Sequence, residues 1–271
     1  MALLLLAAPA EAKLSPVDQI RNLHLSYAIY LGGVHIMDST TAFTREGPVY
    51  NIAMQAGTQG FTRSLIPWDA DLNSTGRMEA DAVHPANATI ATHWQKKPER
   101  VEFQYADNDV KAEFFPVKKK KKEYVPQEMR QGSLDPLNSV VQLMTGIANG
   151  KGCAQQVPVF DGKRRFDVAL KDRGSETLKG EDYSIFNGAA QKCAMEFTLL
   201  AGSPKDREDS QFWENSKGNN MRPPIFVYLG QVRENLPPLP VRAETETPFG
   251  SVMVHLTGVD DGTKKAAAKN P

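Results

Sequence analysis

The chain has 271 residues, 41% of them hydrophobic, and its 32 basic side chains balance its 32 acidic ones. This hydrophobic content is enough for a folded core, so a wholly disordered protein is excluded. The zero net charge argues against a nucleic-acid-binding protein, since such proteins normally contain a markedly basic domain.

Residues 1–12 have the pattern of a secretory signal peptide. Leu3 to Ala8 form an apolar segment, and Ala10-Glu11-Ala12 supplies a cleavage site with small residues before Lys13. The alternative interpretation is an apolar N-terminus that is buried in the fold. No later stretch approaches the roughly 18 apolar residues of a membrane-spanning helix. We therefore expect a periplasmic protein that does not span a membrane.

The first half of the chain alternates apolar and polar residues, which is the pattern of half-buried strands. Every second side chain from Leu23 to Leu31 is apolar, and Gly32-Gly33 then indicates a tight hairpin turn. One or two turns of helix are expected between Gln59 and Ile66. Further strands are expected over residues 34–43, 49–55, 68–71, 76–79, 88–94, 100–105 and 111–115.

A run of lysines, Lys118, Lys119, Lys120, Lys121 and Lys122, follows these strands. It is interpreted as a solvated loop that also blunts a sheet edge. The alternative is contact with an anionic surface, because a lysine near anionic lipid headgroups contributes about 1 kcal/mol of binding.

Residues 135–149 carry the signals of the one long helix. Asp135 is a suitable N-cap, and Pro136 is a suitable first helical residue. Apolar residues from Leu137 to Ile147 recur at helical spacing, and Gly150 is a suitable stop. We expect this helix to pack on the sheet and to plug an open side of it.

The second half of the chain returns to strand patterns. Strands are expected over residues 155–160, 164–170, 181–186, 192–200, 224–234, 239–246 and 251–257, and a disordered tail over residues 260–271. Many short strands and one helix predict a mostly β protein with a single domain over residues 13–259. Its antiparallel sheet should curl into a barrel or half-barrel.

Cys153 and Cys193 are the two cysteines of the chain. In an exported protein, such a pair is expected to form a structural disulfide. Closing the loop between them would stabilise the fold by roughly 4 kcal/mol. Two buried free thiols are the alternative. A metal site is disfavoured, because neither cysteine has another ligand at a suitable spacing.

The motifs of common enzymes and nucleotide sites do not occur in the sequence, so no catalytic residue, cofactor or metal is expected. Asp69-x-Asp71-x-Asn73 resembles part of a calcium loop but lacks the required glycine and glutamate, and is interpreted as a solvated turn. His24 and His35 are expected on neighbouring strands, where they could meet. His84 and His93 are expected on either side of a turn. All four are interpreted as surface or edge residues.

Several motifs carry a resemblance to a known family. They are Leu134–Leu137, Gly152-Cys153, Pro158–Asp167, Cys193, Pro240–Arg242 and Thr247–Gly250, with the strand and turn Tyr27–Gly33 near the N-terminus. Together these residues resemble the proteobacterial exported "domain of unknown function 3108" family over most of the mature chain. The lysine run is not part of this resemblance.

The resemblance implies a periplasmic β protein without an established function. Its curled sheet would be similar to the barrels that carry lipids and lipoproteins between membranes. Such a sheet could hold an acyl chain against its apolar concave face, with the helix as a lid or plug. The leading hypothesis is therefore a non-enzymatic envelope protein that binds a lipid or a lipoprotein segment. The alternatives are a structural protein that binds another envelope component and an enzyme that acts on the cell wall.

Overall fold

The structure is a computed structural model that describes residues 20–79, 82–95, 97–117, 125–202 and 223–269. The predicted signal peptide (1–12) and the lysine run Lys118–Lys122 lie outside these described residues. Both therefore stay predictions.

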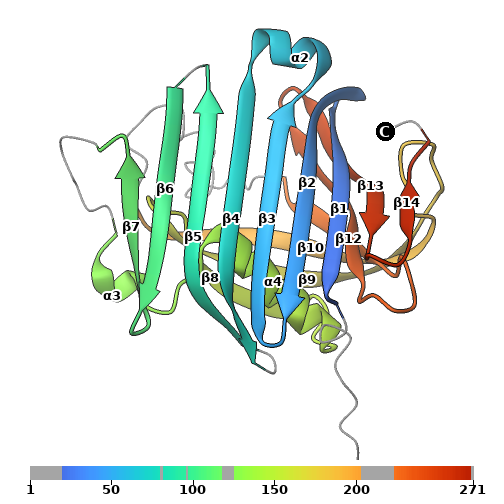
Figure 1. Ribbon diagram of the computed structural model, residues 1–271. Helices are drawn as coiled ribbons and strands as arrows, with labels where there is room; N and C mark the ends of the chain where they lie inside the picture. The colour runs from blue at the N-terminus through green and yellow to red at the C-terminus, as the bar shows by residue number, and fades with distance from the viewer. Residues whose placement is uncertain (1–19, 80–81, 96, 118–124, 203–222, 270–271) are drawn as a thin grey trace, which may run out of the picture.

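Most of the described chain forms one antiparallel sheet of fourteen strands (Figure 1). Its hydrogen-bonded order is β7-β6-β5-β4-β3-β2-β1-β13-β12-β11-β10-β9-β8, and β14 pairs with β13 beside this path. Strands that follow each other in the chain are neighbours in the sheet, except β7 and β8, which form the two ends of the path. Strand β1 joins the two halves by pairing with β13. The strands are β1 (Asn22–Leu31), β2 (Val34–Glu46), β3 (Val49–Thr58), β4 (Trp68–Glu79), β5 (Ala82–Trp94), β6 (Lys97–Ala106), β7 (Asp109–Phe115), β8 (Gln155–Phe160), β9 (Arg165–Leu178), β10 (Gly188–Ala201), β11 (Ile225–Gly230), β12 (Leu239–Thr247), β13 (Gly250–Asp260) and β14 (Lys265–Ala267).

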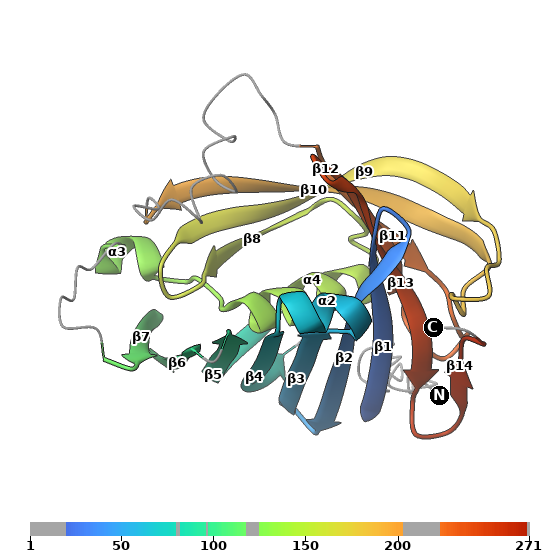
Figure 2. The same ribbon diagram turned by 90° about the horizontal axis from the view of Figure 1, so that it is seen from above.

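The helices of the described ranges are α2 (Gly60–Leu65), α3 (Gln127–Arg130) and α4 (Pro136–Ala148). The predicted long helix is confirmed as α4, with Asp135 as its N-cap. Seen from above, α4 lies between a front layer formed by β1–β7 and a back layer formed by β8–β10 (Figure 2). Strands β11–β13 connect the two layers, so the sheet curls around the helix.

Tight turns with left-handed backbone connect several neighbouring strands. Gly32 and Gly33 have φ values of +55° and +84° in the β1–β2 turn, and Asp107 and Asn108 have +50° and +63° in the β6–β7 turn. Both pairs have the positive φ values of the hairpin turns that match the right-handed strand twist. The first turn is the one expected from Gly32-Gly33.

The sheet is curled but not closed. The two ends of its strand path, β7 and β8, do not pair with each other in the described part of the chain. Side chains join the two layers instead: the rings of Phe103 and Phe160 meet edge-on with centroids 6.2 Å apart, and Lys163 Nζ lies 3.6 Å from Glu99 Oε2. The predicted fold class, a mostly β antiparallel sheet curled into a half-barrel with a packed helix, is confirmed.

Two predictions about the second half are wrong. Residues 181–186 form turns rather than a strand. The segment is attached to β13 by a single hydrogen bond, in which Ile185 N donates to Leu256 O at 3.0 Å. The tail predicted to be disordered contains β14, which pairs with β13. The turn before β14 is organised by Asp261, whose Oδ1 accepts hydrogen bonds from the backbone of Thr263 and Lys264 at 3.1 Å.

A third prediction, the turn between His84 and His93, is also wrong. Both histidines lie within β5, which continues through Pro85. The register of β5 against β4 shifts between the pairs Thr75↔Asn87 and Gly76↔Pro85. Such a bulge accommodates a proline, which has no N–H to donate to the neighbouring strand.

Candidate functional site

A buried carboxylate fixes the N-terminal end of α4 to the front layer. Asp135 is 1% exposed, and its Oδ1 accepts hydrogen bonds from the backbone N–H groups of Leu137 and Asn138, both at 3.1 Å. Ser74 of β4 donates to the same oxygen at 2.7 Å, and Tyr105 of β6 donates to Oδ2 at 2.8 Å. A buried carboxylate is tolerated when donors surround it in this way. Asp135 therefore caps the helix and ties it to two strands.

Asn138 and Tyr50 complete this set, which we call the Asp135 cluster (Asp135, Ser74, Tyr105, Asn138 and Tyr50). Tyr50 donates to Asn138 Oδ1, and Asn138 Nδ2 donates to Asp135 Oδ2. Burial, followed by the neighbouring Asp135 carboxylate, raises the pKa of both Tyr50 and Tyr105. The two phenols therefore stay neutral and act as donors, so the cluster positions the helix.

The other end of α4 is attached to the back layer by a disulfide. Cys153 follows the helix and Cys193 lies on β10, with sulfur atoms 1.93 Å apart and Cα atoms 5.5 Å apart. Both cysteines are buried. The predicted pairing is confirmed, and it leaves the helix fixed at both ends.

Between these two attachments, α4 covers one end of the inner face of the sheet. Leu137 and Val141 pack against buried residues of the front layer, and Leu143 and Ile147 pack against buried residues of the back layer. We call the covered part the closed end. Its sheet residues are Tyr50, Ile52, Met78, Val83, Val157, Val159, Phe166, Val168 and Leu170.

Farther along the front strands, toward α2, many inward residues are only half buried, although Thr58 and Ala70 are buried. The register places Met37, Ile29, Val254, Ala243 and Val227 in one cross-strand row, and each of them is half buried. A second inward row is equally half buried. It consists of Met54, Leu72 and Ile90. These eight apolar residues, which we call the open inner face, have the half-buried polar residues Ser39, Thr41 and Thr92 beside them on the same side of the sheet.

The open inner face can receive an apolar ligand, because partly solvated apolar side chains gain free energy when they are covered, at about 25 cal/mol per Å². The sequence predicts an apolar concave face but does not single out these residues. Alternation along each strand assigns them inward. Which inward residues remain uncovered depends on how far α4 reaches, and this is a property of the assembled fold.

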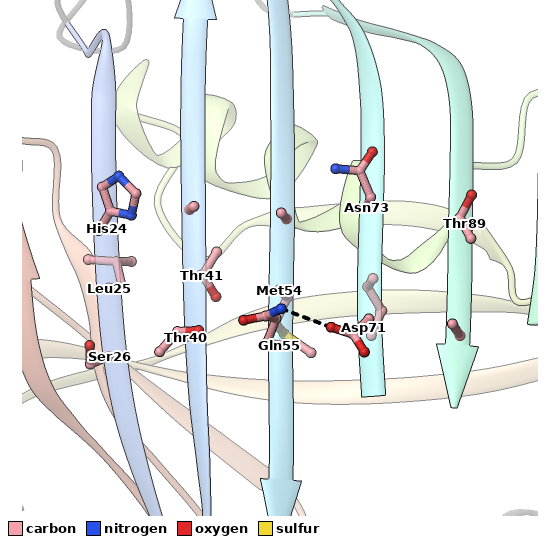
Figure 3. Close-up of a pocket in the computed structure, with 14 residues that line it drawn as sticks. His24, Leu25, Ser26, Thr40, Thr41, Met54, Gln55, Asp71, Asn73 and Thr89 are labelled. Atoms are coloured by element: carbon pink, nitrogen blue, oxygen red, sulfur yellow. Dashed lines mark hydrogen bonds between the residues drawn. The ribbon is translucent and has the colours of Figure 1, made fainter. Parts of the chain in front are cut away.

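The outer face of β1–β5 carries a shallow depression of about 590 Å³ (Figure 3). Small side chains, among them Ala42, Ala53 and Ala91, leave room at its floor. Polar side chains lie around them, and Gln55 Nε2 donates to Asp71 Oδ1 at 2.9 Å. The other polar residues that line the depression from the outer face are His24, Ser26, Thr40, Asn73 and Thr89. This is a surface for a polar partner rather than for an acyl chain.

The histidines of the β1–β2 hairpin do not meet. His24 pairs with Ala42 and His35 with Tyr30, which places the two imidazoles at different levels of the hairpin. His35 instead contacts Asp38 at 2.7 Å. The expectation that His24 and His35 could meet is therefore wrong.

The calcium-like motif Asp69-x-Asp71-x-Asn73 lies on strand β4, so its interpretation as a turn is wrong. Arg63 of α2 donates to Asp69 Oδ1 at 2.7 Å, and this hydrogen bond holds the pKa of Asp69 below its usual value. In the described residues, no three or more His, Cys, Asp and Glu side chains are grouped so that they could hold a metal ion.

His255 of β13 is the one buried histidine among the described residues, at 3% exposure. Its ring lies 4.8 Å from that of Tyr183 and 5.8 Å from that of Tyr30, between ring centroids. Burial and then the cation of Arg242 lower the pKa of His255, although Glu181 and Glu244 act in the opposite direction. His255 is therefore neutral near pH 7. No local pattern indicates this environment, because Tyr183 reaches His255 from a turn that is distant in the chain.

Comparison with known proteins places these observations in a family. No curated protein matches the chain. Among the helices of the described residues, none is both long and apolar enough to cross a membrane. A solved structure from Brucella abortus, described as a β-barrel-like protein of domain of unknown function DUF1849, is similar with a TM-score of 0.48 and 12% identity, covering 89% of this chain and 98% of that one. The family described as "Protein of unknown function (DUF3108)" matches residues 26–257, so the chain belongs to this family.

Proposed function

We propose that this protein is a non-enzymatic periplasmic protein of the bacterial envelope that binds a lipid or the acylated segment of a lipoprotein on its open inner face. The observation that carries the proposal is the set of eight half-buried apolar side chains on that face, beside a closed end of the same sheet that α4 fills. A disulfide between Cys153 and Cys193 is compatible with an oxidising compartment such as the periplasm.

Native mass spectrometry of the protein purified from its own host tests the proposal. We expect a non-covalently bound lipid or acylated peptide, released by organic solvent. Replacing Leu72 by Lys places a charge on the apolar face, and a buried unpaired charge is strongly unfavourable. The affinity of the L72K variant for the ligand should therefore be at least about tenfold lower than that of the wild type.

The matched control is the neighbouring Asn73, whose side chain points to the outer face. The N73K variant carries the same new charge one residue away and should keep its ligand. Far-UV circular dichroism checks that both variants retain the sheet. A wild-type protein that carries no ligand and takes up no added acyl lipid would contradict the proposal.

A second candidate function, binding to another envelope component, is favoured by the polar depression on the outer face. For this function, we expect N73K and L72K to behave in the opposite way. Affinity purification should then return one stoichiometric protein partner, which N73K loses and L72K keeps. If both variants keep the partner, the depression is not its binding site.

A further inference from the structure

Exposed apolar side chains gather at the end of the sheet where α2 lies. The described residues include eleven large hydrophobic side chains that are prominently exposed, and six of them occupy four chain tips at this end. The three aromatic ones, Phe61 at 78%, Trp94 at 51% and Phe249 at 85% exposure, are all among the six. The set, which we call the apolar rim, is Val34, Phe61, Leu65, Ile66, Trp94 and Phe249.

Hydrogen bonds and strand register hold these tips next to one another. Gly32 N donates to Ser251 O at 2.9 Å, which places the β1–β2 turn with Val34 beside the β12–β13 turn with Phe249. Gln59 N donates to Ile36 O at 2.9 Å and so joins α2 to β2. Trp94 stands opposite Trp68, the first residue after the α2 connection. The rim is therefore a continuous feature of one end.

Helix α2 and its C-cap residue Ile66 supply half of the rim, and the helix has no buried residue. A short amphipathic helix normally turns its apolar side chains toward the core. In α2 the helix is instead held by polar contacts: Thr58 Oγ1 donates to Ile66 O at 2.9 Å, and Arg63 pairs with Asp69 at 2.7 Å. These contacts leave Phe61 and Leu65 in solvent.

The charges of the tips distinguish this end from the opposite one. The described residues of the four tips, 32–34, 59–67, 94–97 and 248–250, contain two cations, Lys97, which is exposed, and Arg63, which is paired with Asp69 at the start of β4. The turns at the opposite end contain carboxylates, including Glu46, Asp107 and Asp109. Apolar and aromatic side chains flanked by cations match the interface of a bilayer that contains anionic lipids.

We propose that the apolar rim docks the protein on the surface of a lipid bilayer containing anionic phospholipid. Separate tips can enter a fluid interface together, and each inserts its own side chain. Docking would bring the open inner face next to the membrane, because both lie toward the α2 end of the sheet. The inference deepens the proposed function, on which its biological meaning rests.

Flotation of the full protein with vesicles of phosphatidylethanolamine and phosphatidylglycerol tests the docking. We expect the wild type to float with the vesicles. The triple variant F61S/L65S/F249S should bind at least about tenfold more weakly, since three large apolar side chains no longer enter the lipid. The control variants V49S and V140S remove exposed apolar side chains elsewhere on the surface and should bind as the wild type does.

A wild type that stays in solution, or a triple variant that floats as well as the wild type, would overturn the docking proposal. Equal weakening of the controls would overturn it as well. If the rim instead pairs two copies, size-exclusion chromatography would show a dimer that the triple variant loses, with no vesicle binding. Native mass spectrometry of the same samples separates the docking proposal from the ligand-binding proposal. A triple variant that keeps its acyl ligand but no longer binds vesicles has lost docking alone.

Discussion

The two ends of the inner face are built from the same strands and differ in what covers them. On β3, Ile52 is 4% exposed because α4 packs over it, whereas Met54, two residues farther along, is half buried. On β4, Met78 is buried and Leu72 is half buried in the same way. Strand alternation alone makes all four residues equivalent.

The difference shows that a single helix, fixed at both ends, divides one apolar face into two regions. At the closed end the apolar residues stabilise the fold. At the open end they contribute less to stability and remain available for a ligand. The position of α4 is therefore the feature that determines where a binding region is left.

The largest expected effect comes from releasing the C-terminal attachment of α4. Reducing the Cys153–Cys193 disulfide opens a link with a sequence separation of 40 residues. On the chain-entropy model this lowers the free energy of unfolding by about 4 kcal/mol. Urea denaturation with and without reductant measures the change. The variant C153S/C193S should already have the lower stability and should not respond to reductant.

Removing the N-terminal attachment should be the next largest perturbation. Asp135→Ala deletes the N-cap and leaves Ser74, Tyr105 and two backbone N–H groups without their acceptor. We expect a loss of about 3 kcal/mol in the free energy of unfolding. Asp135→Asn should cost less, because it keeps one acceptor oxygen. A loss below about 1 kcal/mol for the alanine variant would mean that the cluster does not hold the helix.

The contrast between the ends predicts that truncating two apolar side chains of β3 to alanine has unequal effects on stability. Ile52→Ala at the closed end should lower the free energy of unfolding by about 3 kcal/mol, because it leaves a cavity under α4. Met54→Ala at the open end should cost about 1 kcal/mol, because its side chain is half solvated in the native state. Thermal or urea unfolding of the two variants gives the comparison. Equal losses would show that the two ends are equally packed.

The smallest expected effect is a pH dependence from His255. Its pKa in the folded protein lies below the ordinary value of 6.5, so below that pH the unfolded chain binds a proton that the folded chain resists. The free energy of unfolding should therefore fall as the pH drops below about 6.5, by at most about 1.4 kcal/mol per pH unit. His255→Gln should flatten this slope, whereas His84→Gln, at an exposed site, should leave it unchanged.

Local patterns predict local structure well in this chain. Asp135, Pro136 and the helical spacing that follows predict α4, because capping and amphipathicity depend on neighbouring residues. Alternation predicts β1, and Gly32-Gly33 predicts its turn. The strand predicted over residues 181–186 is wrong because its position depends on distant parts of the chain. The segment looks like a strand by composition, but its place is set by its attachment to β13, which no local pattern encodes.

The candidate site is harder to predict than the fold, because it depends on residues that meet only after the sheet has curled. Asp135 is recognisable as a cap, but its hydrogen bonds from Ser74 and Tyr105 require β4 and β6 to reach the helix. The inward direction of Met54 and Leu72 follows from alternation. Their incomplete burial follows from the position of α4, which packs over Ile52 and Met78 and leaves Met54 and Leu72 at the edge of that cluster.

Paramagnetic broadening of methionine methyl signals tests most directly whether the open inner face binds an acyl chain. With methyl-labelled methionine and a spin-labelled stearate below its micelle concentration, Met37 and Met54 should broaden strongly at the open end. Met78 at the closed end and Met253 on the outer face should broaden far less. Selective loss of the Met37 and Met54 signals is the predicted result. Equal broadening of all four methionines, or of none, would contradict binding on the open inner face.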